Sequence, residues 1–95
     1  MQVATYKVPG GKLLRIKARV EDERAFGVQI SGDFFLAPHD KIVVLEEALE
    51  GFSISDKEAI VEVVDYVMQR DNIVVAGFSA KDLAHTMSLL GGSDV

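Results

Sequence analysis

Two histidines, His39 and His85, and a set of scattered serines are the side chains of this sequence that could act in acid–base or nucleophilic chemistry. No carboxylate stands at metal-ligand spacing to make a recognisable site. We expect a surface or capping role for His39 at a helix start and an ordinary helix-surface role for His85. No serine lies in a nucleophile-elbow context, and there is no cysteine to serve as a nucleophile or thiolate ligand. Asp33 is a tempting catalytic candidate, but no base, nucleophile or metal ligand stands nearby. The sequence therefore predicts no self-contained active site.

The segment Pro9-Gly10-Gly11-Lys12 is the other candidate for chemistry. Its glycines could expose backbone N–H groups to a phosphate, and Lys12 and the nearby Lys7 would add positive charge. It is not a Walker A motif, because Leu13 replaces the Ser or Thr and a strand is expected to follow instead of a helix. A plain hairpin turn is the main structural alternative.

Apolar residues alternate with a period of two through the first third of the chain, which predicts strands at residues 3–8, 13–20 and 26–31. In the second segment the outward positions are Arg15, Lys17 and Arg19, a cationic row. In the third we expect Phe26, Val28 and Ile30 to point inward. Glu21-Asp22-Glu23-Arg24 is of hairpin length. Short connections of this kind predict an antiparallel meander.

After Pro38 the apolar residues recur every three or four positions, which predicts helices. One is expected over Asp40–Glu50, and a second begins at Ser55 as N-cap of a capping box with Glu58. A last helix follows a similar cap at Ser79-Ala80-Lys81-Asp82 and ends at Gly91-Gly92, with residues 93–95 as a frayed tail. Residues 73–78 could be a fourth strand or a buried connection. The expected fold class is α+β: a three-stranded antiparallel meander followed by two to three helices on one face.

Between sheet and helices lies a cluster of special residues, Gly32-Asp33-Phe34-Phe35. Gly relieves the backbone where a strand ends, and Asp accepts backbone N–H bonds in turns, so Asp33 is expected to fix the corner. Phe34 and Phe35 cannot both follow one face of a strand. One is expected in the core, and the other plugs the base of the helices or faces a partner.

Length and charge limit the functional classes. Ninety-five residues make one domain, 1–95, in which a complete nucleotide-dependent enzyme, with separate sites for ATP and an acyl substrate, would be cramped. Hydrophobic residues make up 48%, which indicates either a Val- and Leu-rich core or an apolar patch that a partner covers. Residues 1–24 have a net charge of +3 and residues 33–95 of −8, and the acidic total argues against general nucleic-acid binding. No apolar run could span a membrane and no signal peptide is visible, so a cytoplasmic protein is expected.

Three segments resemble the accessory domain of lipoate–protein ligases, in the order of that family. They are Lys7-Val8-Pro9-Gly10-Gly11-Lys12-Leu13-Leu14-Arg15-Ile16, Ile30-Ser31-Gly32-Asp33-Phe34-Phe35 and Gly77-Phe78-Ser79-Ala80-Lys81-Asp82-Leu83. The chain is most similar to the archaeal form, in which this domain is a separate small polypeptide. The resemblance covers nearly the whole chain.

The resemblance implies a small non-catalytic subunit that forms a heterodimer with a catalytic large subunit. The large subunit would bind lipoate, ATP and Mg²⁺ and form lipoyl-AMP, while this chain alone would hold no cofactor. The acceptors would be lipoyl domains of 2-oxoacid dehydrogenases and the glycine-cleavage H protein. Our hypothesis is that Lys7, Pro9, Gly10, Gly11 and Lys12 approach the partner or its active site. From their residue types we expect Gly32, Asp33, Phe34 and Phe35 to form a structural corner or interface.

Two other functional classes remain open. The chain could be a stand-alone adaptor that uses its apolar surface and acidic helices without serving a ligase. It could also be a small-anion-binding module that uses the row Arg15, Lys17 and Arg19.

Overall fold

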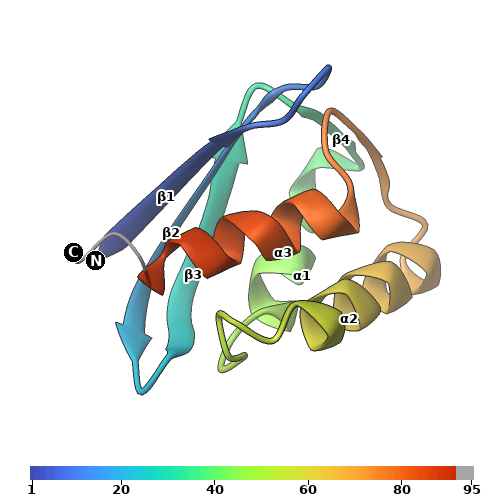
Figure 1. Cartoon of the computed structure of the whole chain (residues 1–95). Coiled ribbons are helices and arrows are strands. Elements are labelled where there is room, and N and C mark those ends of the chain that lie inside the picture. The colour runs from blue at the N-terminus through green and yellow to red at the C-terminus, as the bar shows by residue number, and fades with distance from the viewer. Residues whose placement is uncertain (92–95) are drawn as a thin grey trace.

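The computed structural model describes residues 1–91, so the expected frayed tail and Gly92 lie outside the described residues. The first three strands form the expected antiparallel meander in the order β1-β2-β3 (Figure 1). Asp22 and Glu23, both with positive φ, make a two-residue turn between β2 and β3, shorter than the four-residue connection expected. The strand bounds are β1 Gln2–Lys7, β2 Leu13–Glu21 and β3 Arg24–Gly32.

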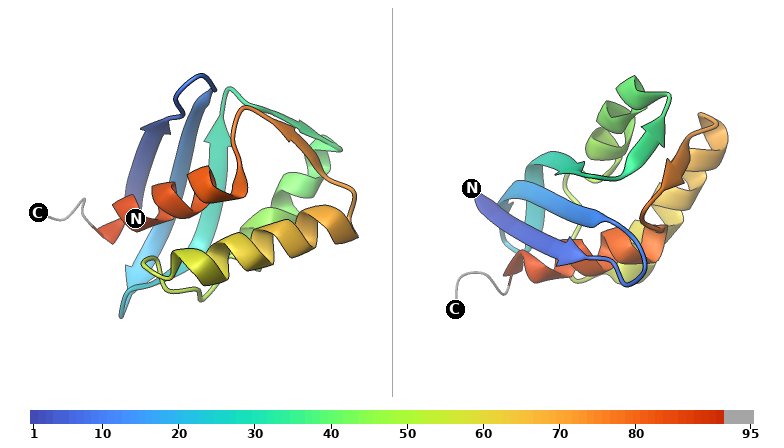
Figure 2. Two further views of the ribbon diagram at one scale, coloured as in Figure 1. Left: turned by 45° about the vertical axis from the view of Figure 1, so that its right-hand side comes forward. Right: turned by 90° about the horizontal axis from the view of Figure 1, so that it is seen from above.

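Three α-helices lie on one side of this sheet and leave the other side open (Figure 2). α1 packs on β3, α3 crosses β1 and β2, and α2 packs against both helices. The predicted α+β class is therefore confirmed. The bounds are a 3₁₀ turn η1 at His39–Lys41, then α1 Ile42–Ala48, α2 Lys57–Arg70 and α3 Ala80–Leu89.

The N-terminal cap of α3 was predicted correctly from the sequence, and that of α2 was not. The capping box at Ser79 and Asp82 is present, with each side chain bonded to the other residue's backbone N–H. The box predicted at Ser55 is wrong. Asp56 is the N-cap of α2, and its carboxylate accepts a hydrogen bond from the N–H of Ala59 at 3.3 Å. Two acceptors in a row made both readings possible, and the carboxylate, one position closer to the helix, takes the role.

A second sheet, absent from the prediction, joins segments far apart in the sequence. β4 (Phe35–Ala37) pairs antiparallel with β5 (Val74–Ala76). Residues 73–78, for which the sequence left two alternatives open, thus contain a short strand. This β4–β5 ribbon ties the exit of β3 to the entrance of α3.

A β-bulge overturns part of the predicted alternation in β3. Arg19 pairs with Phe26 although Lys17 pairs with Gln29, so an extra residue stands in β3, and Gly27 there has φ +64°. The extra residue reverses which side chains face inward. Ala25 is fully buried in place of Phe26, which is half-buried under the guanidinium of Arg19.

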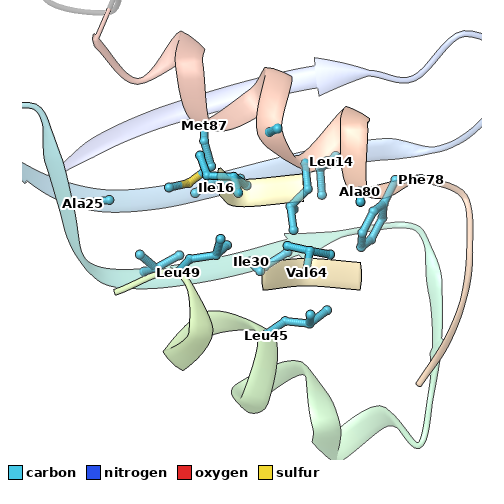
Figure 3. Close-up of a cluster of buried hydrophobic side chains, with 14 of the residues drawn as sticks. Leu14, Ile16, Ala25, Ile30, Leu45, Leu49, Val64, Phe78, Ala80 and Met87 are labelled. Carbon is cyan, nitrogen blue, oxygen red and sulfur yellow. The ribbon is translucent and has the colours of Figure 1, made fainter. Parts of the chain in front are cut away.

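The core lies between the sheet and the helices (Figure 3). Leu14 and Ile16 from β2 are fully buried, as the alternation predicted, and α3 contributes Leu83 and Met87. Their burial holds α3 across the sheet, since each such side chain stabilises the folded chain by roughly 1.5–3 kcal/mol.

The outer edge of β3 is closed by carboxylates. Glu50, just beyond α1, accepts hydrogen bonds from the N–H groups of Gly27 at 2.9 Å and Val28 at 2.7 Å. Glu46 on α1 accepts one from the N–H of Ile30 at 2.7 Å. These three bonds, named here the glutamate clasp, replace a neighbouring strand and dock α1 on the sheet.

Candidate functional site

The Pro9–Lys12 segment forms a closed turn between β1 and β2. The N–H of Gly11 donates to the carbonyl of Val8 at 2.8 Å, and Gly10 between them has φ +71°, as in a type II turn with proline at its second position. The ammonium of Lys7 donates to the carbonyl of Gly11 at 2.6 Å. Lys7 therefore acts within the chain to hold the turn.

The turn is clamped against Gly77, the first residue after β5. The N–H of Lys12 donates to the carbonyl of Gly77 at 3.1 Å. A Cβ atom on Gly77 would stand 2.8 Å from Cγ of Lys12 and 3.0 Å from Cβ of Phe34, and φ at Gly77 is +123°. A residue without a side chain is therefore required where Gly77 meets the Pro9–Lys12 turn.

Gly32 and Phe34 bring the second motif to the same place. A Cβ on Gly32 would stand 2.1 Å from the carbonyl oxygen of Leu13, so only glycine fits where β3 leaves the sheet. The ring of Phe34 meets that of Phe78 edge to face, with centroids 4.8 Å apart. Phe34 is thus the inward aromatic of the predicted pair.

The three segments that carried the resemblance therefore meet at one end of the molecule, here called the three-motif corner: Pro9–Lys12, Gly32–Phe34 and Gly77–Phe78. Within the described residues, the side chains of Lys12 and Asp33 are exposed and make no hydrogen bond or ion pair. The turn bond expected of the Asp33 carboxylate is not formed. The backbone N–H of Asp33 instead donates to the carbonyl of Leu13 at 3.3 Å.

Beside the corner, the outer face of the β4–β5 ribbon is entirely apolar. Phe35 pairs with Ala76, and Ala37 pairs with Val74. Phe35 and Val74 are each 63% exposed, whereas Leu36, on the opposite face of the ribbon, is buried. Phe35 is thus the outward aromatic of the pair. Val74 and Ala76 were not predicted as part of the site, although the apolar character of residues 73–78 was the available signal.

The two histidines do not take part in this corner. His39 is exposed in η1, as expected. His85 is half-buried, contrary to a simple helix-surface role, because its ring meets that of Tyr6 on β1 at a centroid distance of 4.5 Å. His85 also borders a shallow groove of about 640 Å³ between α2 and α3, with Val61 and Ala84 in its lining. Within residues 1–91, no group of three or more His, Asp or Glu side chains is placed to hold a metal ion.

The N-terminal end of α3 is already occupied by its own cap. The carboxylate of Asp82 accepts from the N–H of Ser79 at 2.8 Å, and the Ser79 hydroxyl accepts from the N–H of Asp82 at 3.2 Å. The positive end of this helix is thus balanced within the chain. Lys12 is the free positive charge of the corner, and the exposed carboxylate of Asp33 is a negative charge in the same corner.

A clear pKa shift lies away from the corner, at the end of α2. The hydrogen bond from Arg70 lowers the pKa of Asp71, and the positive charges of Arg70 and Lys41 act in the same direction. The Arg70 Nε to Asp71 carboxylate distance is 2.8 Å. This pair lies outside the corner and concerns stability.

Among solved structures, the chain is similar to one from a protein-lipoylation system. The matching chain comes from a structural analysis of a bi-partite lipoate protein ligase and its E2 lipoyl domain from Thermoplasma acidophilum. The two are 27% identical, the match covers 90% of each chain, and the TM-score is 0.67. This structural match confirms the predicted resemblance to a two-component archaeal lipoate–protein ligase. No protein-family model and no curated protein matches the chain.

No helix in the described part of the chain is long and apolar enough to cross a bilayer.

Proposed function

We propose that this chain is the small, non-catalytic subunit of a two-component lipoate–protein ligase. In this role it is required, together with a catalytic large subunit, for ATP-dependent conversion of lipoate to lipoyl-AMP and so for protein lipoylation. Lipoate, ATP and Mg²⁺ bind to the large subunit. The lipoyl group then passes to a lysine of a lipoyl domain or of the glycine-cleavage H protein.

The observation that carries this proposal is the similarity over 90% of both chains to part of a bi-partite ligase structure. Equal coverage means that the matching chain is itself about as small as this one. A chain of this size, with an apolar outer ribbon and no assembled catalytic group in its corner, suits a subunit whose partner performs the chemistry.

The β4–β5 ribbon and the adjoining corner supply the surface for the large subunit. Stable interfaces have apolar, aromatic-rich centres, and Phe35 with Val74 provides one here. The clamp between Lys12 and Gly77 fixes the Pro9–Lys12 turn to the base of this ribbon. A partner bound to Phe35 therefore receives the turn at a fixed position.

In the complex, the turn approaches the large subunit near the activated phosphate or a loop that closes over it. The exposed ammonium of Lys12 then offsets negative charge that develops as pyrophosphate leaves. Lys7 has a different role, because its ammonium already binds Gly11 and keeps the turn closed. A second mechanism, in which the turn only orders the loop, predicts no dependence on the charge of Lys12.

Reconstitution tests the function directly. The large subunit is combined with lipoate, MgATP and an unlipoylated acceptor, with and without this chain, and lipoyl-AMP is measured. Formation of lipoyl-AMP at the same rate without this chain would contradict the proposal.

The role of Lys12 is tested by Lys12→Ala, with Lys57→Ala as control because Lys57 is an exposed lysine on α2. ATP–pyrophosphate exchange is expected to fall only in the first variant, at unchanged affinity between the subunits. Equal exchange in both variants would leave loop ordering as the mechanism.

The apolar ribbon also suits the alternative of a stand-alone adaptor. The same reconstitution separates the two functions, because an adaptor would not change the rate at which the large subunit forms lipoyl-AMP.

A further inference from the structure

The side of the three-stranded sheet opposite the helices is uncovered in the described chain (Figure 2). The register of the strands aligns its side chains in cross-strand rows. Thr5, Arg15 and Ser31 form one cross-strand row. The next row consists of Val3, Lys17 and Gln29. Each row has a cation on the central strand between uncharged neighbours, so no carboxylate lies beside Arg15 or Lys17 within its own row.

Two of the three cations that β2 places on this face, Arg15 and Lys17, are free. Within residues 1–91, the side chains of Arg15 and Lys17 make no hydrogen bond or ion pair, and both are exposed. Arg19 is different, because it pairs with Glu21 and lies over the ring of Phe26. Residues 33–95 have a net charge of −8, so a positive sheet face stands in a chain that is negative elsewhere. Such a face attracts carboxylates and repels cations.

The open face differs in chemistry from the β4–β5 ribbon. The ribbon is apolar and suits a stable partner, whereas the sheet face presents hydrated, solvent-exposed charges with hydroxyl and amide groups around them. Exposed charges contribute more to association rate and orientation than to lasting affinity. This face therefore suits a partner that binds briefly and leaves.

We propose that the open face of the sheet, centred on Arg15 and Lys17, docks the protein that receives the lipoyl group, through a carboxylate-rich surface of that acceptor. This inference rests on the proposed function, which requires an acceptor to come and go in every cycle while the large subunit stays bound. The occupant is a folded acidic domain with a target lysine.

The geometry places such an acceptor close to the reaction. β1 and β2 both run into the Pro9–Lys12 turn, and Arg15 stands only a few residues along β2 from Lys12. A domain lying on the sheet face is thus beside the turn that approaches the large subunit. Docking by its carboxylates leaves its lysine, which the cationic face repels, directed away from the sheet.

The test separates acceptor docking from lipoate activation. The double variant Arg15→Glu/Lys17→Glu is combined with the large subunit, and two rates are measured: formation of lipoyl-AMP without acceptor, and transfer to an unlipoylated lipoyl domain at increasing concentration. Lys57→Glu/Lys81→Glu is the control, since it makes the same charge change on the helical side. Circular dichroism checks that each variant folds.

We expect unchanged formation of lipoyl-AMP and an increase of about tenfold or more in KM for the acceptor in the sheet variant only. Added salt should raise KM for the wild type and change it little for the variant, because exposed charges are screened. The neutral variant Arg15→Gln/Lys17→Gln should lie between the two.

Three results would overturn the inference. They are an unchanged KM for the acceptor, an equal increase in the helical control, or loss of lipoyl-AMP formation with dissociation of the subunits, which would assign this face to the large subunit. Failure of the proposed function is a separate result, since lipoyl-AMP would then form equally well without any form of this chain.

Discussion

Phe35 offers the sharpest test of the apolar ribbon as an interface. We predict that Phe35→Ala weakens binding to the large subunit while leaving the free chain folded. A Phe side chain of about 200 Å² that is 63% exposed offers about 125 Å² to a partner, or about 3 kcal/mol at ~25 cal/mol/Å². Alanine retains part of that contact, so the expected loss is about 2 kcal/mol, or about 30-fold in Kd.

Stability should respond less. The buried part of the side chain, about 75 Å², contributes about 2 kcal/mol by the same measure, and the expected loss is about 1 kcal/mol, because alanine keeps the Cβ contact. Titration calorimetry with the large subunit gives Kd, and urea denaturation of the free chain gives the free energy of unfolding.

Tyr66→Ala is the matched control, because Tyr66 is 62% exposed but lies on α2, outside the ribbon. Its Kd should be unchanged. Equal Kd values for Phe35→Ala and the wild type would refute the assignment of the ribbon to the interface. An equal loss in Tyr66→Ala would show that exposed aromatics in general, and not this ribbon, govern binding.

Three further predictions concern the stability of the free chain. Gly32→Ala should destabilise the chain by roughly 2–4 kcal/mol, because the added Cβ would collide with the backbone. Gly10→Ala has open space around it and should cost only roughly 1–2 kcal/mol, the cost of a left-handed backbone conformation. Urea denaturation measures both free energies of unfolding. Glu50→Ala should cost roughly 1–3 kcal/mol, because two N–H groups of β3 lose their acceptor, and Glu50→Gln should cost less. Because the pKa of Asp71 is lower in the folded chain than its unfolded value near 3.8, its carboxylate contributes stability above that value, and this stability is lost as pH falls through the folded pKa. The acid side of a Tm-against-pH curve should therefore be flatter in Asp71→Asn. Identical curves would contradict the pairing with Arg70.

Local patterns predicted the sheet and helices well because each of these elements has one buried and one exposed side. Leu14 and Ile16 are fully buried between exposed cations, as alternation requires. The pattern failed in β3, where Gly27 occupied a position that regular alternation would also allow. A glycine has no side chain to reveal a change of face, so the bulge and the buried Ala25 could not be read from the sequence.

The candidate site was predictable as a set of segments but not as a place. The turn at Pro9–Lys12 follows from local residue types, whereas its hydrogen bond to Gly77 depends on a contact between distant parts of the chain. The β4–β5 ribbon consists of two three-residue strands, too short for any periodic signal. Hence Phe35 could be identified as a partner-facing candidate, and its neighbour Val74 could not.

The glutamate clasp makes three backbone amides reporters of a single docking event. α1 has only seven residues, too few to persist as an isolated helix in water, so its order depends on contact with β3. When α1 and the Leu49–Glu50 segment that follows it separate from the sheet together, the N–H groups of Gly27, Val28 and Ile30 lose their carboxylate acceptors at once. Their hydrogen exchange with solvent should therefore proceed at one common opening free energy, which measures how tightly the first helix is held to the sheet.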